Sequence, residues 1–137
     1  MSTKAVFANW WIRALGIVGA IVGFVPDARY TTLHRAASTA RLVLVADDPN
    51  LIFEMQEDGN MGLNATSATA QIVSGSGSTA TGLSGYQIDS SEEAQTATDQ
   101  LRIIQPVPRL DNDGTAANAK WWVMINMHAY APATAGY

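Results

Sequence analysis

The sequence predicts an all-β fold, a small barrel-like or sandwich domain of short antiparallel strands with an extended N-terminal arm. Several short apolar runs, β-branched or alternating, are separated by turn signals. No long segment has the 3.6-residue period of an amphipathic helix. The 137 residues suffice for one domain with its own core. We expect an arm over residues 1–18, the β domain over residues 19–131 and a tail over residues 132–137.

The expected arm carries Phe7, Trp10 and Trp11 among polar residues, with no regular period. A short arm cannot bury two tryptophans within itself. They need cover either on a neighbouring molecule or on the domain of the same chain, and the sequence leaves both alternatives open.

The apolar run of residues 14–25 is the one stretch that resembles a membrane or targeting segment. It is shorter than the ~20 residues that a membrane span needs. A secretory signal would use Lys4 and Arg13 as its positive end, but a turn signal follows at once and no small-residue cleavage site closes the run. Its valines, isoleucines and glycines favour a strand or tight strand pair over residues 17–25. Without a signal, the chain stays where it is made.

Two strands are expected in the next part of the chain. Residues 41–46 form a β-branched apolar run, and residues 51–56 alternate as a half-buried strand does. Residues 47–50 are a strong turn signal of Asp, Pro and Asn. Residues 57–60 form the next turn, and their Asp-Gly pair is a hairpin signal.

The middle of the chain, residues 64–85, is rich in Ser, Thr, Ala and Gly. This composition fits loops that join short strands, and it also fits a flexible insertion. Residues 86–89 are expected to form a short strand. Residues 92–100 have the pattern of a helical turn, although Thr96 and Thr98 disfavour it.

The C-terminal part contains the strongest strand signal. Residues 101–107 form a strand that ends at prolines, and residues 111–114 form a turn. In residues 120–127, alternation predicts one apolar face towards the core and one face away from it. The expected core face is Trp121, Val123, Ile125 and Met127, and the opposite face is Trp122, Met124 and Asn126.

Composition excludes several classes of function. There is no cysteine, which removes disulfides, cysteine zinc sites and thiol catalysis. Charged residues are 15% of the chain, against about a quarter in typical domains, and the net charge is -4. The eight basic residues are spread along the chain rather than clustered. We therefore expect no direct nucleic-acid partner and no membrane partner.

Metal binding is not expected. The chain has two histidines, His34 and His128, whereas a zinc site needs three or four ligands. Residues 111–114 are similar to the start of a calcium loop, but Trp122 stands at the twelfth position, where such a loop needs Glu. An Asx-rich turn is the favoured interpretation.

No catalytic residue and no cofactor site is predicted. Asp47 and Asp48 with Glu54 would be an acid–base set, but acidic turns are far commoner than catalytic carboxylate pairs. Residues 82–85 lack the spacing of a nucleophile elbow, and no P-loop lysine follows the glycines of residues 74–79. A small hydrolase with an Asp/His site at His128 is the weakest of the functional hypotheses.

Aromatic and arginine residues are the positive signal. Trp, Tyr and Arg dominate the binding energy of protein interfaces. We expect a partner interface that uses Phe7, Trp10, Trp11, Arg13, Arg29, Tyr30, His34, Arg35, Trp122, Tyr130 and Tyr137.

Three segments, residues 37–59, 77–89 and 96–128, together about half of the chain, carry a resemblance. In order they contain a strand, D-D-P-x, a strand ending F-E-x-Q, then T-G-x-S-G, another strand, and a final aromatic strand ending N-x-H. This order resembles the capsid cement, decoration or head-stabilising proteins of tailed bacteriophages. The shared pattern marks strands and turns, not a catalytic site.

The resemblance implies a β-barrel-like domain present in many copies on the outer capsid surface of the virion, after synthesis in the host cytoplasm. Its partners would be the major capsid protein and itself, as a dimer or trimer at local symmetry axes. It implies no enzymatic activity. The alternative is a carbohydrate- or host-surface-binding β-module, with Trp121, Trp122 and Tyr130 as a platform for sugar rings.

Overall fold

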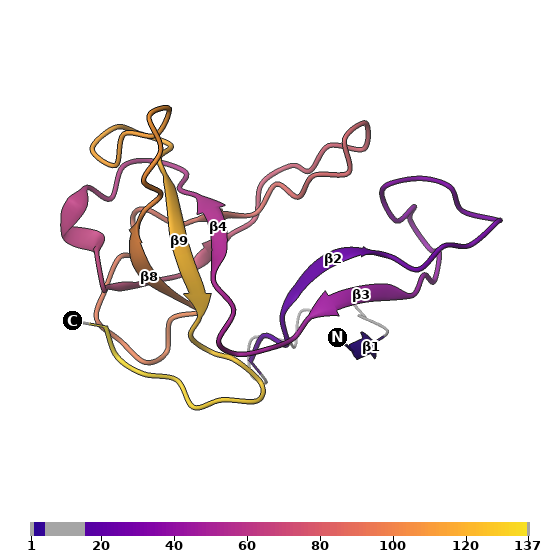
Figure 1. Ribbon diagram of the computed structural model, residues 1–137, viewed down its shortest axis with the longest axis horizontal. Coiled ribbons are helices and arrows are strands. Elements are labelled where there is room, and N and C mark those ends of the chain that lie inside the picture. Colours follow the sequence, from indigo (N-terminus) through magenta and orange to yellow (C-terminus); the bar gives the residue numbers. More distant parts are fainter. Residues whose placement is uncertain (1, 5–15, 137) are drawn as a thin grey trace.

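The computed structural model describes residues 2–4 and 16–136 (Figure 1). The predicted all-β class is confirmed, because the described residues form antiparallel sheets and no α-helix. Among these residues the sheets stay open, so the sandwich-like form occurs and the barrel does not. A helix of the length and hydrophobicity that a membrane span needs is not found in the described part of the chain.

The N-terminal sheet has three strands in the order β1-β3-β2. They are β1 (Ser2–Lys4), β2 (Ala20–Phe24) and β3 (Val43–Ala46). The run predicted as a strand or strand pair is thus a single strand, β2, paired with β3. This hairpin and its connecting loop extend away from the rest of the molecule (Figure 1). We call residues 20–46 the N-terminal finger.

A four-stranded sheet forms the centre of the remaining chain, in the order β4-β9-β8-β5. It consists of β4 (Phe53–Gln56), β9 (Lys120–Ile125), β8 (Leu101–Pro106) and β5 (Thr69–Ala70). The first three were predicted from the sequence. The two-residue strand β5 was not, because Thr-Ala carries no strand pattern of its own.

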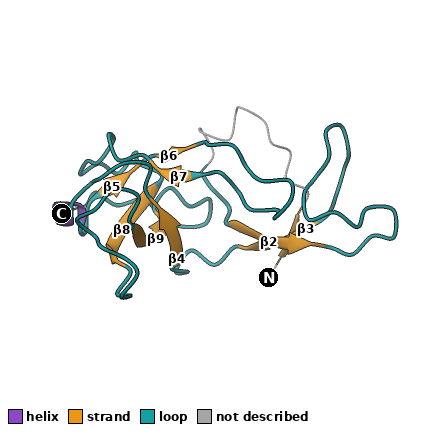
Figure 2. Cartoon of the chain, turned by 90° about the horizontal axis from the view of Figure 1, so that it is seen from above, coloured by secondary structure: helices purple, strands orange, loops and turns teal. Residues whose placement is uncertain are grey.

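A short ribbon covers one face of this sheet. It pairs β6 (Ile72–Val73) with β7 (Gln87–Ile88), and a 3₁₀ turn, η2 (Leu63–Ala65), packs near β8. Between β6 and β7 the chain runs outward beside the N-terminal finger (Figure 2). We call residues 74–86 the second finger, and residues 47–73 and 87–136 the body.

The core lies between the four-stranded sheet and the ribbon. Trp121 is fully buried, and Val123, Ile103, Leu101 and Ile88 are at most 2% exposed. The cross-strand pairs Met55–Trp121 and Phe53–Val123 bring two partly buried side chains of β4 onto the same face. The predicted core face is therefore confirmed at Trp121 and Val123.

The predicted alternation is wrong beyond the end of the strand at Ile125, which still pairs with the buried Leu101. Asn126 is 6% exposed, whereas Ile125 and Met127 are only partly buried. The strand ends at Ile125, so the two-residue period stops there. The Asn126 amide is buried because it is satisfied: Nδ2 donates to the Asp99 carbonyl (3.1 Å) and Oδ1 accepts from the Thr134 N–H (3.1 Å).

The hairpin turn expected at residues 57–60 does not form, and a buried glutamate, Glu57, lies there instead. β4 pairs with β9 and not with the next strand, so the Asp-Gly hairpin prediction is wrong. The Glu57 side chain is fully buried, and its carboxylate accepts the backbone N–H groups of Met61 (2.7 Å) and Ala119 (3.2 Å). These two hydrogen bonds hold the Glu57 side chain in the interior. A tight hairpin would expose that side chain.

The helical turn expected at residues 92–100 is also wrong, since the segment forms bends and turns. Asp99, 4% exposed, organises it. Its carboxylate accepts the Thr69 hydroxyl (2.7 Å) and the Gln71 amide (2.7 Å). An isolated antiparallel β-bridge also joins Thr69 to Ala94. These tertiary hydrogen bonds outweigh a weak local helical tendency.

The described residues near the two ends of the chain contact the rest of the same chain. Ser2–Lys4 pairs with β3, and the Ile17 N–H donates to the Met127 carbonyl (2.6 Å). Thr134, in the tail, receives a hydrogen bond from Arg102 (2.9 Å). The expected interface residues Phe7, Trp10, Trp11, Arg13 and Tyr137 lie outside the described residues.

Replacing Glu57 by Gln should destabilise the fold. A Gln amide has one acceptor oxygen, so one of the two buried N–H groups would face an NH₂ group. We expect a loss of about 1–3 kcal/mol in the free energy of unfolding by urea. The exposed Glu93→Gln is the matched control and should change this free energy by less than about 0.5 kcal/mol. Equal stability of Glu57→Gln and the unaltered protein would contradict the assigned role.

Candidate functional site

The two fingers lie side by side and are joined near their tips. The His34 ring donates from Nδ1 to the carbonyl oxygen of Thr79 (3.1 Å), which assigns its proton to that nitrogen. Gly82 has φ +72°, and a Cβ there would lie 2.7 Å from the Cβ of Leu33. Only glycine permits both this backbone conformation and this close approach. The fingers therefore present one combined surface.

Arg41 organises the loop at the end of the N-terminal finger. Its guanidinium donates to the backbone carbonyls of Thr32 (2.8 Å), His34 (3.1 Å) and Tyr30 (3.1 Å). It also lies 4.2 Å from the centre of the Phe24 ring, a cation–π contact. A loop with little core of its own is thus held by one planar, multidentate side chain.

Arg29 and Arg35 carry positive charge to the surface of the same loop. Arg29, whose side chain is 80% exposed, pairs with Asp27 (3.1 Å). Hydrogen bonds from the Arg29 side chain, and then from its backbone N–H, hold the pKa of Asp27 below its usual value. Because the folded pKa is lowered, this pair operates at neutral pH and is lost only as the pH falls through that value. Arg35 donates to the Thr39 carbonyl (2.8 Å).

Exposed apolar side chains concentrate on the two fingers. Six of the ten large exposed hydrophobic residues of the described chain lie there, although the body holds most of the described residues. They are Ile21, Val22, Leu33, Leu42, Leu83 and Tyr86. Scattered exposed hydrophobic residues are normal, but their concentration on these projecting elements makes the fingers the candidate interaction surface.

Among the described residues, strand β2 lies at an edge of the N-terminal sheet. A bulge between Ile21 and Gly23 leaves Ile21 and Val22 more than half exposed in succession. The strand has no Lys, Glu or Pro. Such residues, and also bulges, protect edge strands from pairing with another chain. In β2 the bulge is the protective feature, and the exposed Ile21 and Val22 remain available for side-chain contacts.

A broad groove of about 1610 Å³ separates β2 from the four-stranded sheet. Its walls are mainly apolar and include Ile21, Phe53, Met55, Leu83 and Val123. Because its walls are mainly apolar, the groove extends the exposed apolar surface of the fingers.

Within the described part of the chain, no group of three His, Cys, Asp or Glu residues is arranged to hold a metal ion.

The sequence predicted part of this surface. Arg29, Tyr30, His34 and Arg35 come together on the loop of the N-terminal finger. Trp122 and Tyr130 lie elsewhere: Trp122 in strand β9 of the body, and Tyr130 just beyond it. The predicted interface residues thus fall on two separate surfaces and not one.

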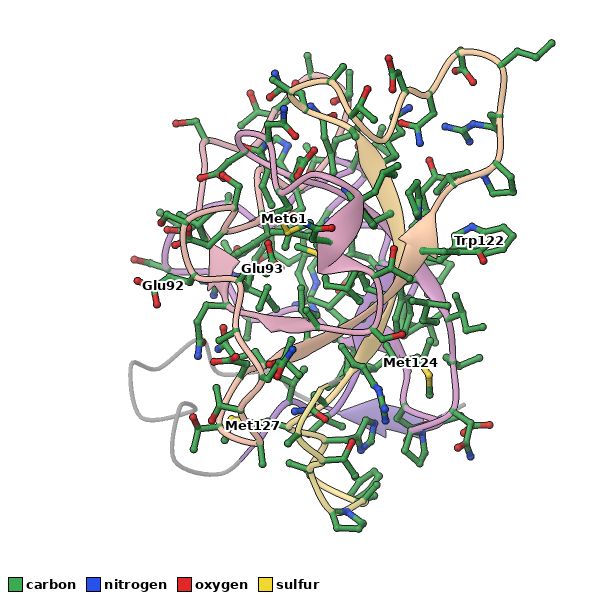
Figure 3. The ribbon with its side chains drawn as sticks, turned by 90° about the vertical axis from the view of Figure 1, so that its left-hand side faces the viewer. Met61, Glu92, Glu93, Trp122, Met124 and Met127 are labelled. Carbon is green, nitrogen blue, oxygen red and sulfur yellow. The ribbon has the colours of Figure 1, made fainter. Side chains whose placement is uncertain are left out.

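Trp122 belongs to the outer face of the four-stranded sheet. It is paired with Glu54 of β4 and is partly exposed, and Met124 projects from the same side of the sheet, away from Met61 in the core (Figure 3). Ile52, which is 56% exposed, precedes β4. Because Trp121 is fully buried, the platform of Trp121, Trp122 and Tyr130 expected for sugar binding does not form.

Glu54 is engaged on this outer face and is not paired with Asp47 or Asp48. The Arg109 guanidinium donates two hydrogen bonds of 3.0 Å each to the Glu54 carboxylate, and this contact raises the pKa of Arg109. The Asp48 carboxylate accepts the N–H of Asn50 (2.8 Å) within its own turn. The geometry therefore gives no acid–base set at these residues.

In the turn at residues 111–114, the Asn112 side chain is directed inward, whereas Asp111 and Asp113 are exposed. Asn112 accepts the Lys120 N–H (2.7 Å) and donates to the Val107 carbonyl (3.0 Å). Hydrogen bonds from the Thr115 hydroxyl and backbone N–H lower the pKa of Asp113. These contacts describe an Asx-rich turn, as the sequence favoured.

His128 is buried against the end of β9. Its Nδ1 accepts the Tyr130 N–H (3.0 Å), so the neutral ring carries its proton on Nε2. The two rings lie 5.4 Å apart at a tilt of 53°. Within the described residues no hydrogen bond or ion pair joins His128 to a carboxylate. The contacts fit a residue that shapes the end of the strand.

Sequence reasoning missed three contributors to the fingers. Arg41 was assigned only as the start of a strand, and its carbonyl contacts arise from the loop that folds back over it. Leu33 and Leu83 are single leucines in polar segments, without a period. Only the neighbouring Ser-, Thr- and Gly-rich composition signalled loops there.

The fold and these surfaces define an all-β protein with two projecting fingers and a separate aromatic face. No protein-family model, curated protein or solved structure that was compared with the chain matches it.

Replacing Arg41 by Lys should loosen the loop of the N-terminal finger. An ammonium group cannot bridge three carbonyls with the planar geometry of a guanidinium. We expect amide hydrogen exchange at Tyr30 to accelerate about tenfold, in line with the loss of charge-assisted hydrogen bonds, while exchange in β9 stays unchanged. Arg35→Lys, which removes one carbonyl contact, is the control. Unchanged exchange at Tyr30 in Arg41→Lys would contradict the organising role.

Proposed function

We propose that this is a non-enzymatic structural protein that binds the outer surface of a phage capsid. It clamps neighbouring major capsid subunits and stabilises the head against internal DNA pressure. The observation that carries the proposal is the concentration of exposed apolar side chains on two joined, projecting fingers. The resemblance of three sequence segments to cement proteins adds the identity of the partner.

A clamp needs two contact surfaces that are held apart. The fingers form one, with Leu33 and Leu83 exposed near their tips. The outer face of the four-stranded sheet forms another, with Trp122, Met124 and Ile52. Once one surface has bound, the other is held at a high effective concentration near its own site. Two modest contacts then resist the separation of neighbouring subunits more strongly than either contact alone.

The composition suits an extended protein contact. Apolar side chains on the fingers supply buried area, and arginines supply hydrogen-bonding groups that tolerate burial. A stable contact of this kind buries at least about 1,000 Å² in total. Projecting fingers reach such an area without requiring a large flat face on the body.

The first test uses capsids that lack the protein. Added protein should cosediment with them and raise the temperature at which they release DNA. The double variant Leu33→Asp with Leu83→Asp should bind at least about tenfold more weakly, because two charges would be buried at the contact. Both side chains are exposed, so its unfolding temperature should change little.

Leu110→Asp is the matched control for this experiment. Leu110 is fully exposed, but it lies on a body loop and not on a finger. Its variant should bind and stabilise capsids normally. Normal capsid binding by the double finger variant would refute the proposed contact, and an unchanged DNA-release temperature with bound protein would refute the stabilising function.

A second prediction concerns the outer sheet face. Trp122→Ala should leave cosedimentation measurable through the fingers but reduce the gain in DNA-release temperature, because one of two contacts is lost. The free energy of unfolding is measured on the same sample to confirm that the sheet is intact. A full gain in Trp122→Ala would contradict a clamp with two surfaces. Binding to a glycan array through Trp122 would favour the alternative of a carbohydrate-binding module.

A further inference from the structure

The charge of the chain is divided unevenly between the N-terminal finger and the remaining structure. The N-terminal finger, residues 20–46, contains three arginines and one aspartate, a net charge of +2. Residues 47–136 contain three basic and eleven acidic residues, a net charge of -8. The molecule is therefore strongly dipolar, although its total charge is modest.

The positive end coincides with uncovered apolar surface. Arg29 and Arg35 lie on the exposed loop that also carries Leu33, and Ile21 and Val22 follow on the open edge of β2. A second, smaller hollow of about 670 Å³ lies here, lined by Val22, Leu33 and other residues of the two fingers. Nothing in the described chain covers this combination of charge and apolar area.

The negative end has carboxylates without compensating cations. Asp58 lies beside residues 89–93, because its N–H donates to the Ile88 carbonyl (3.0 Å) and its carboxylate accepts the Ser90 N–H (2.9 Å). Glu92 and Glu93 project from this side of the body (Figure 3). None of the ion pairs among the described residues includes these three carboxylates, whereas Glu54 and Asp111 are paired with Arg109.

We propose that the N-terminal finger of one copy docks on the acidic side of the body of a second copy, head to tail. Attraction between opposite charges orients the encounter, and the apolar side chains of the finger provide the buried area. The contact concerns the free protein and does not depend on capsid binding.

The charges select this arrangement over a symmetric one. A two-fold contact between two fingers would place Arg29 and Arg35 of one copy near the same residues of the other, and like charges repel. A head-to-tail contact places them near carboxylates. Such a contact produces a ring when the rotation closes and a chain when it does not. Either product carries the same interface.

The salt dependence of self-association is the first measurement, by sedimentation velocity of the full chain over a range of concentrations. Raising NaCl from about 0.01 M to about 0.15 M shortens the Debye length from about 30 Å to about 8 Å. We expect the dissociation constant to rise at least about tenfold. A monomer at every salt and protein concentration would overturn the proposal, as would association that salt strengthens.

Charge reversal then tests which surfaces meet. Variant one carries Arg29→Glu with Arg35→Glu on the finger, and variant two carries Glu92→Lys with Glu93→Lys on the body. Each alone should be monomeric, since each pairs like charges. An equimolar mixture should assemble again, because the acidic finger of one meets the basic body of the other. Asp48→Lys with Asp111→Lys changes the net charge as much as variant two and should leave assembly intact.

The outcomes separate the two arrangements. Finger-to-finger pairing predicts that variant two, whose fingers are unaltered, assembles like the original protein, and that result would overturn the head-to-tail contact. A mixture that stays monomeric would overturn it as well. Circular dichroism and the unfolding temperature of each variant establish that it is folded before its assembly is measured.

Discussion

The buried carboxylate of Glu57 is the constraint on which the arrangement of the body depends. It lies where β4 ends, and its two oxygens hold the N–H groups of Met61 and Ala119. The backbone of the same residue bonds the Ala119 carbonyl, and its carbonyl accepts the Gln87 side chain. One residue thus joins β4, the segment before η2, the start of β9 and the ribbon. A buried carboxylate without these donors would cost several kcal/mol, on the order of the stability of a small domain.

This junction places Trp121 in the core, and the body then supports the fingers. Trp121 follows Lys120, the first residue of β9, so the anchored Ala119 sets which face of the strand points inward. Its neighbour Trp122 is consequently directed outward, onto the second surface of the proposed clamp. The N-terminal finger contains β2 and β3, and the second finger extends from the ribbon. Hydrogen bonds of Arg41 organise the loop of the N-terminal finger, and His34 joins the two fingers.

The proposed clamp and the proposed head-to-tail contact both use the N-terminal finger, so a finger that is bound to the capsid is not available to a second copy. The N-terminal finger combines apolar side chains with exposed arginines, and the body is acidic. The head-to-tail contact therefore belongs to the free protein, and binding to the capsid would replace it at the finger. Screening by salt acts on the contact between copies, whereas apolar contacts with the capsid respond less to it.

The sequence by itself determined the all-β class and most of the strand positions. It also determined that Trp121 is buried and that Trp122 faces outward, because successive side chains of a strand point to opposite faces of the sheet. It also showed that Arg29, Tyr30, His34 and Arg35 share one loop. Only the tertiary structure decided the pairing of β4 with β9, the burial of Glu57 and Asn126, the turns of residues 92–100 and the junction of the fingers. These features depend on hydrogen bonds between residues far apart in the chain, such as Glu57 with Ala119 and His34 with Thr79. Local sequence patterns do not predict such partners.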